Sequence, residues 1–150
     1  MRNFEIRAVE KDTELARKLI RFVEDFSWEE VKAHTLQNLN NWVFTEWETM
    51  FVALVDGEIV GMASLGKTDY YPLPEIFPWV STLFVSEEWR GQGICGRLID
   101  HANAHARALG FDRTYIPTEF TGLYERYGYR YLRDIVNYGG DTDRLYCKDL

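Results

Sequence analysis

The spacing of hydrophobic residues along the chain distinguishes predicted helices from predicted strands. Apolar residues three and four positions apart favour an amphipathic helix, whereas alternation or a short apolar run favours a strand. The spacing predicts helices that begin near residues 13 and 27, a longer helix over 94–109 and a short helix over 121–127. It predicts strands over 4–8, 50–55, 58–65, 80–85, 112–116, 129–135 and 144–148. We therefore expect an α/β (α+β) fold with a mixed, mostly antiparallel sheet of about seven strands and helices on both faces.

Local polar signals mark several of the predicted boundaries. Asp12 or Thr13 is the expected N-cap of the first helix. The run 27–30, Ser-Trp-Glu-Glu, has the form of a capping box, so Ser27 is the expected N-cap of the second helix. Asp56-Gly57 predicts a type I′ turn between two strands. Segment 67–78 holds three of the four prolines, which predicts a rigid, exposed connection of the kind that carries specificity.

Composition limits the class of protein. At 150 residues and 46% hydrophobic, the chain is expected to form a single domain over 1–150. A net charge of −7 argues against nucleic acid as a partner, because phosphate backbones are met by basic patches. The cysteines, Cys95 and Cys147, lack C-x-x-C spacing and are expected to be free thiols in a reducing compartment. Residues 1–5 lack the apolar region of a signal peptide, and no stretch is long enough to span a membrane. We expect a soluble, cytoplasmic protein that needs no membrane partner.

The most informative stretch joins the predicted strand 80–85 to the predicted helix 94–109. Between them lies the segment 90–96, Arg-Gly-Gln-Gly-Ile-Cys-Gly. Glycines at the start of a helix let the backbone approach a ligand closely, and the N–H groups there point outward. The positive end of the helix dipole adds to the attraction for an anion. This segment therefore predicts a phosphate-binding site.

The glycine pattern fits more than one phosphate-binding template. Gly91-x-Gly93-x-x-Gly96 matches the dinucleotide fingerprint, and Glu119 is then placed to bind a ribose. Residues 86–90 separate the strand from the first glycine, however, whereas the dinucleotide turn is tight. A P-loop is excluded because neither Lys nor Ser or Thr follows the last glycine.

Pro117 follows the predicted strand 112–116 and is expected to end it, because proline cannot donate a hydrogen bond to a sheet ladder. The neighbouring strand over 80–85 would then part from it. Parted parallel strands leave backbone groups that an extended ligand with amides can bind.

The order of strand, acidic linker, Arg-Gly-x-Gly-Ile and helix resembles the acetyl-CoA signature of the GNAT superfamily of N-acetyltransferases. Arg90 and Gly93 match its pattern, and Cys95 stands where the family has Gly or Ala. The segment 123–129, Leu-Tyr-Glu-Arg-Tyr-Gly-Tyr, is similar to the family's second signature. Pro117 stands where many members carry an asparagine. The resemblance covers the whole chain and implies two splayed central parallel strands that receive the pantetheine arm.

The resemblance implies acetyl-CoA as co-substrate and a small-molecule or peptide amine as acceptor. It implies that Tyr124 is the general acid, which protonates the sulfur of departing coenzyme A. The pantetheine would pair with the strand 80–85, and the pyrophosphate would lie on the glycine segment. The cofactor-binding residues implied are Leu83, Phe84, Val85, Arg90, Gly91, Gln92, Gly93, Ile94, Cys95 and Gly96.

The general base is open at this point. An alkyl amine has a pKa near 10.4, so about one molecule in 10³ is neutral at pH 7. Some members of the family carry a glutamate on the strand that corresponds to 80–85, where this chain has no carboxylate. The candidates are Glu75 and Glu119, with Asp69, His34 or a chain of waters as further options.

Other functions fit parts of the sequence. The missing strand carboxylate suits a non-catalytic acyl-CoA sensor on the same fold, and the glycine pattern admits a nicotinamide-linked oxidoreductase. His101 and His105 have the spacing of a metal pair without a third ligand, so no metal site is predicted. Cys95 at a helix start would suit a nucleophile only with a lowered pKa and an adjacent base. The surplus of aromatic residues leaves a homodimer open.

Overall fold

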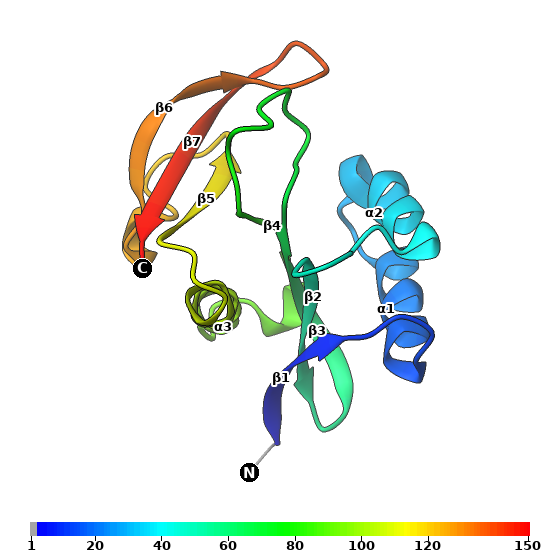
Figure 1. Ribbon diagram of the computed structural model, residues 1–150. Coiled ribbons are helices and arrows are strands. Elements are labelled where there is room, and N and C mark those ends of the chain that lie inside the picture. The colour runs from blue at the N-terminus through cyan, green and yellow to red at the C-terminus, as the bar shows by residue number, and fades with distance from the viewer. Residues whose placement is uncertain (1–2) are drawn as a thin grey trace.

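The computed structural model describes residues 3–150, and one sheet runs through them (Figure 1). The described strands lie side by side in the order β1-β2-β3-β4-β5-β7-β6. The strands are β1 (Phe4–Val9), β2 (Thr49–Val55), β3 (Glu58–Gly66), β4 (Trp79–Val85), β5 (Arg113–Thr118), β6 (Arg130–Val136) and β7 (Thr142–Asp149). The helices are α1 (Glu14–Asp25), α2 (Glu29–Asn41) and α3 (Ile94–Ala108), with short 3₁₀ turns η1 (Glu87–Trp89) and η2 (Glu125–Tyr127).

The sheet is mixed and mostly antiparallel, as the sequence predicts. Of the neighbouring pairs in the described sheet, β4 and β5 alone run parallel. The β2–β3 hairpin turns at Asp56 and Gly57, whose φ angles of 50° and 85° are those of a type I′ turn. The expected α/β (α+β) class is confirmed.

Helices cover both faces of the sheet, and each face has its own core. Figure 1 shows α1 and α2 on one side of the strands and α3 on the other. Alternate residues of β2 point to opposite faces. Phe51 and Ala53 pack with Leu98 of α3, whereas Met50 and Val52 belong to the cluster built around α1. Burial on both faces explains why β2 is a continuous apolar run.

The parting of β4 and β5 is the feature of the fold that positions the site. Their register contains the single pair Trp79↔Tyr115, and Figure 1 shows β5 turning away from β4 beyond it. The Tyr115 N–H donates to the carbonyl of Pro78, so it faces β4. Pro117, two residues on, has its nitrogen on the same side and has no hydrogen to donate. The expected splay is therefore confirmed, and proline removes the donor where the two strands separate.

Pro117 does not end β5, contrary to the sequence prediction. The strand continues to Thr118, and Pro117 lies opposite Leu145 of β7. The prediction was wrong because the missing donor of Pro117 faces the splay, so pairing with β7 on the other side is unaffected.

Two helix predictions also need correction. Trp28, not Ser27, occupies the N-cap position of α2 and makes no side-chain capping hydrogen bond. The side chain of Glu30, the last member of the expected capping box, lies outside the described residues. The predicted helix over 121–127 shrinks to η2, because Gly122 adopts a left-handed conformation with φ of 81° that breaks the helix.

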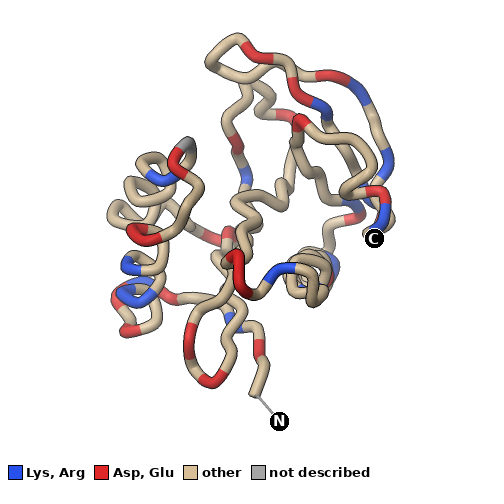
Figure 2. The backbone as a smooth tube through the Cα atoms, turned by 180° about the vertical axis from the view of Figure 1, so that it is seen from behind, with Lys and Arg blue, Asp and Glu red and all other residues tan. Residues whose placement is uncertain are grey.

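Among the described residues, none of the helices has the length and apolar character needed to cross a membrane. Met1 and Arg2, which belong to the segment used for the signal-peptide prediction, lie outside the described residues. Acidic residues occur on the helices, the β2–β3 hairpin and the loops, with basic residues interspersed among them (Figure 2).

Candidate active site

The splay between β4 and β5 opens into a cavity of about 1070 Å³, which we call the main cleft. Strand β4, the N-terminus of α3 and the loops after β5 and β6 contribute to its wall. Its lining includes Leu83, Phe84, Val85, Arg90, Cys95, Pro117, Glu119 and Tyr124. The structure thus brings residues of the glycine segment, the strand and the second signature to one cavity.

The glycine segment forms the start of α3 at the edge of the main cleft. Gly93 is the N-cap, and Gly91 and Gly93 have φ angles of 76° and 79°. A Cβ atom added at either glycine would meet nothing within 4 Å, so the space in front of them is open. A glycine cap has no side chain to satisfy the first helical N–H groups, which are then available to an anion. The geometry fits a phosphate group.

Arg90 is held in place at the end of β4. Its Nε donates to the carbonyl of Val85 at 2.8 Å, and its guanidinium lies 5.4 Å from the centre of the Phe84 ring. The arginine of the signature therefore ties the glycine segment to the strand while it lines the main cleft.

Gly96 is required by packing. A Cβ atom there would lie 2.8 Å from Cε1 of Tyr127, closer than real Cβ contacts allow. The third glycine of the segment thus lets α3 approach η2, which follows directly after Tyr124. The close approach links the glycine segment to the second signature.

Tyr124 lies half-buried in the wall of the main cleft. Burial, followed by the nearby Cys95 and Tyr127, raises the pKa of its phenol well above the ordinary value. The phenol therefore keeps its proton at neutral pH, as a general acid must.

Cys95 does not have the properties of a nucleophile. Burial raises the pKa of its thiol above the ordinary value, although a hydrogen bond with Tyr127 opposes the shift. The lowered pKa on which a nucleophilic role depends is absent, because burial disfavours the charged thiolate.

The two carboxylates named first as candidate bases lie in different places. Glu119 is exposed and lines the main cleft, directly after β5. Glu75 is exposed in the segment between β3 and β4 and does not belong to the lining of the main cleft. The structure therefore brings Glu119, but not Glu75, to the wall that holds Tyr124.

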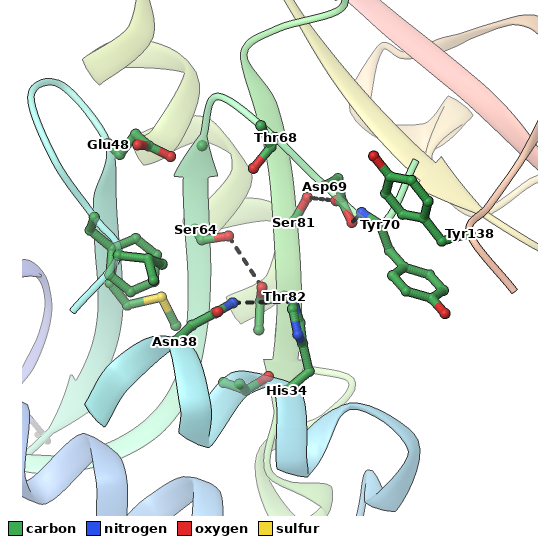
Figure 3. A pocket seen from close by; sticks show the side chains of 15 residues that line it. His34, Asn38, Glu48, Ser64, Thr68, Asp69, Tyr70, Ser81, Thr82 and Tyr138 are labelled. Atoms are coloured by element: carbon green, nitrogen blue, oxygen red, sulfur yellow. Dashed lines mark hydrogen bonds between the residues drawn. The ribbon is translucent and has the colours of Figure 1, made fainter. Parts of the chain in front are cut away.

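A second cavity, of about 390 Å³, lies beside α2 and the starts of β2 and β4; we call it the side cavity (Figure 3). Asp69, Ser81 and Thr82 line it, and His34 stands at its α2 side. The same three residues line a smaller cavity of about 180 Å³, the connecting cavity, which shares Leu83 and Tyr124 with the main cleft. Asp69, but not Glu75 or Glu119, lines both the side and connecting cavities.

A bulge in β4 shapes the boundary between these cavities. Ser81 and Thr82 are adjacent, so in a regular strand their side chains would face opposite sides of the sheet. The register shifts between Met62 and Ser64, and Thr82 adopts a φ of 53°, which is strained for a β-branched residue. Both side chains then reach the side cavity, where the Ser64 and Thr82 hydroxyls share a hydrogen bond of 3.2 Å. Strain of this kind is frequent at functional sites.

Sequence reasoning missed most of the side cavity. Its lining comes from α2, β2, β3, β4, the segments 43–48 and 66–70, and Tyr138. One signal was available, because Ser64, Ser81 and Thr82 place hydroxyl groups inside otherwise apolar strands. Such residues in predicted core strands indicate a lined cavity.

The histidine pair lies on α3. The His101 and His105 rings both contact Phe51, at 5.2 and 5.4 Å between centres. Burial, and then the neighbouring His105, lowers the pKa of His101. No group of three potential metal ligands occurs within residues 3–150.

Comparison with known proteins identifies the family. The sequence model described as the acetyltransferase (GNAT) family matches residues 14–129. The chain therefore belongs to the GNAT family of acetyltransferases, enzymes that use acetyl-CoA as co-substrate. The comparison with curated protein sequences gave no match.

Solved structures share the fold across nearly the whole chain. An acetyltransferase from Streptococcus agalactiae superposes with a TM-score of 0.69 at 18% identity, covering 98% of each chain. A GNAT acetyltransferase from Elizabethkingia anophelis, with acetyl-CoA bound, gives 0.65 at 21% identity and covers 99% of each. An aminoglycoside 6'-N-acetyltransferase complexed with coenzyme A gives 0.72 at 15% identity, covering 97% of this chain and 96% of its own. At these identities the likeness establishes the fold.

Proposed function

We propose that the chain acts as one N-acetyltransferase domain over residues 1–150, which moves an acetyl group from acetyl-CoA directly to a primary amine. The observation that carries the proposal is that the splay of β4 and β5 and the glycine start of α3 open into one cleft. An extended ligand with an amide arm and a pyrophosphate needs both features at once. The bound acetyl-CoA and coenzyme A of two structural neighbours support this ligand, and the aminoglycoside acetyltransferase supports an amine acceptor.

The proposed binding residues follow the main cleft. The N–H groups of the segment 90–96 would hold the pyrophosphate, with Gly91 and Gly93 leaving room for it. The edge of β4 over 83–85 would pair with the pantetheine, since its register to β5 ends at Trp79. Backbone N–H groups near Phe84 or Val85 would stabilise the oxyanion that develops on the thioester carbonyl.

Tyr124 is the proposed general acid. Its phenol remains protonated, lines the main cleft and belongs to the segment that resembles the family's second signature. Donation to the sulfur of coenzyme A lets the C–S bond break without forming a free thiolate. Glu119 and Glu75, the base candidates of the sequence, are exposed side chains, so a proton leaving through them would pass to solvent.

The absence of a carboxylate on β4 supports a second candidate, an acyl-CoA sensor that binds without turnover. Turnover separates the two, because a sensor binds acetyl-CoA without releasing thiol in the presence of amines.

The free cysteines Cys95 and Cys147 support a cytoplasmic location. We also propose that the net charge of −7 keeps nucleic acid from binding. A homodimer remains an open prediction.

Thermal melting tests the proposed ligand. A ligand at 100 times its Kd stabilises the folded state by about 2.7 kcal/mol. For a chain of this size that corresponds to a rise in Tm of about 5–10 °C. We expect this rise with acetyl-CoA and coenzyme A and none with NAD. A rise with NAD alone would contradict the proposal, and thiol release with amines then distinguishes enzyme from sensor.

A further inference from the structure

The side cavity is linked to the main cleft through the connecting cavity. It shares Asp69, Ser81 and Thr82 with the connecting cavity, which in turn reaches Leu83 and Tyr124 of the main cleft. A molecule in the side cavity therefore approaches the proposed general acid from the α2 face of the sheet, while acetyl-CoA would lie along the splay.

We propose that the side cavity binds the acceptor as a compact cationic amine that carries no acidic group, and that Asp69 takes the first proton from its ammonium group. This inference rests on the proposed N-acetyltransferase function. It adds the chemical class of the acceptor and a candidate base outside β4, the strand that carries no carboxylate in this chain.

The charges of the side cavity favour a cation. Asp69 and Glu48 both line it, and Figure 3 shows them on separate sides of the cavity. None of the described residues in its lining is Lys or Arg. Glu48 is fixed by the backbone N–H of Lys67, which donates to its Oε2 at 3.0 Å. An acceptor with a carboxylate or phosphate would therefore meet like charge without a compensating partner.

Aromatic and apolar side chains complete the lining. Phe44, Tyr70 and Tyr138 contribute aromatic rings to the lining, and an ammonium group is attracted to the face of such a ring. Val43 and Met50 add apolar surface. The volume of about 390 Å³ lies near the lower end of the range of about 300–1,000 Å³ for small-molecule pockets. The lining thus suits a small amine with an apolar body rather than a multi-ring polycation.

Asp69 is positioned as a base by contacts that hold its carboxylate. Its Oδ2 accepts a hydrogen bond from the Ser81 hydroxyl, and its Oδ1 accepts one from the Tyr70 N–H at 2.6 Å. These bonds orient the group between the side and connecting cavities. His34, the other candidate on this side, is exposed and bonded to Asn38, with 3.2 Å between Nε2 and Nδ2.

The proton balance of the reaction assigns each group one task. The ammonium gives one proton to the Asp69 carboxylate, and the neutral amine nitrogen forms a bond to the acetyl carbon. The carbon–sulfur bond breaks as Tyr124 donates its proton to sulfur. The nitrogen loses its second proton, which restores the tyrosine, and Asp69 returns its proton to solvent.

The environment of Asp69 supports this task. Burial raises the pKa of its carboxyl; hydrogen bonds from Ser81 and Tyr70 and the nearby His34 oppose the shift, whereas Asp143 adds to it. The Asp143 carboxylate is itself held by the Tyr71 hydroxyl at 2.7 Å. A base must be deprotonated, so activity is expected to rise with pH through the raised pKa of Asp69. The midpoint of this rise should lie at a higher pH than the pKa of an ordinary aspartate.

Matched pairs of amines test the proposed acceptor class. Each pair holds an amino acid and its decarboxylated amine: phenylalanine and phenethylamine, histidine and histamine, valine and isobutylamine, lysine and 1,5-diaminopentane. We expect thiol release from acetyl-CoA with at least one of these amines, at a kcat/KM at least about 10²-fold above its amino acid. Kanamycin is expected to be a poorer acceptor. An amino acid that outperforms its amine, or turnover of kanamycin alone, would overturn the acceptor class.

The base is tested with Asp69→Asn, which preserves the size of the side chain. The amide oxygen can still accept from the Tyr70 N–H, and the amide nitrogen can donate to the Ser81 hydroxyl oxygen in place of the bond that the carboxylate accepts. We expect kcat/KM for the preferred amine to fall by about 10² to 10³ and the acid limb of the pH profile to disappear. Asp112→Asn, at an exposed site before β5, is the matched control and should leave both unchanged. An unchanged pH profile in Asp69→Asn would overturn the assignment.

Acetyl-CoA binding separates failure of this inference from failure of the proposed function. If acetyl-CoA raises the Tm of the wild type and of Asp69→Asn equally, the main cleft is intact in both. Wrong acceptor specificity then refutes only the side-cavity proposal. No thiol release with any amine, despite binding of acetyl-CoA, would refute the transferase function and the side-cavity proposal with it.

Discussion

The main cleft and the side cavity are built in different ways. In the main cleft, the proposed contacts to acetyl-CoA are made by backbone, with the contiguous segment 90–96 for the pyrophosphate and the edge of β4 for the pantetheine. The side cavity consists of side chains brought together from α2, β2, β3, β4 and three loops. A backbone site binds the same group whatever side chains surround it, whereas a side-chain site follows each substitution in its lining. The first arrangement suits a constant co-substrate and the second suits a particular acceptor.

Tyr124 lines both the main cleft and the connecting cavity and is the proposed general acid, so its removal is expected to have the largest effect. Tyr124→Phe should lower kcat by about 10²-fold or more because the leaving sulfur then departs without a proton. The Tm shift with acetyl-CoA should persist. Tyr131→Phe, at an exposed position on β6, is the control. Unchanged turnover in Tyr124→Phe, measured with the preferred amine, would remove this residue from the chemistry.

Gly93→Ala tests the backbone character of the main cleft. A side chain at a φ of 79° is strained, and the new methyl group would enter the open space where the phosphate is expected. We expect the KM for acetyl-CoA to rise about tenfold, which corresponds to about 1.4 kcal/mol. Gly57→Ala offers a matched control, since Gly57 has a φ of 85° and equally open surroundings in the β2–β3 turn. An equal change of KM in both variants would show that strain alone is responsible.

Gly96→Ala tests whether the third glycine serves packing. The added methyl group forces the Tyr127 ring to move, and overpacking costs about 1–3 kcal/mol. The better helix propensity of alanine offsets about 1 kcal/mol of this. We expect a net fall in Tm of about 2–4 °C by circular dichroism. Gly96→Ala should cause no fall in Tm when it is added to Tyr127→Leu, compared with Tyr127→Leu alone. A fall of the same size in that background would show that the contact with the Tyr127 ring is not the cause.

Asp69→Asn is expected to change stability slightly and in the favourable direction. Burial raises the pKa of Asp69 in the folded state, so the folded protein holds the charged form at a cost once the pH exceeds that pKa. The variant should melt about 2–4 °C above the wild type at pH 8, equivalent to about 1 kcal/mol. The gap should close as the pH falls and the carboxyl becomes protonated. A wild type that is the more stable at pH 8 would show that the carboxylate is favourably paired.

The contrast between the two cavities also explains what the sequence could predict. The glycine segment is contiguous, so its chemistry can be inferred from neighbouring letters, and the sheet followed from hydrophobic spacing. Pro117 predicted the splay correctly but not the end of β5, because a sequence does not show which neighbour a strand nitrogen faces. The prediction of a helix over 121–127 was wrong at Gly122, because its left-handed conformation depends on the local turn. Asp69 was one of several candidate bases, since a sequence does not show that this loop residue lines both the side cavity and the connecting cavity.

The most direct test measures the KM of both substrates in Gly93→Ala and Asp69→Asn by thiol release. Separate roles for the main cleft and the side cavity predict that Gly93→Ala raises the KM for acetyl-CoA and leaves the amine KM unchanged. They predict that Asp69→Asn lowers kcat/KM for the amine and leaves the binding of acetyl-CoA unchanged. If each variant impaired both substrates equally, the two cavities would form a single binding site and their separate assignment would be wrong.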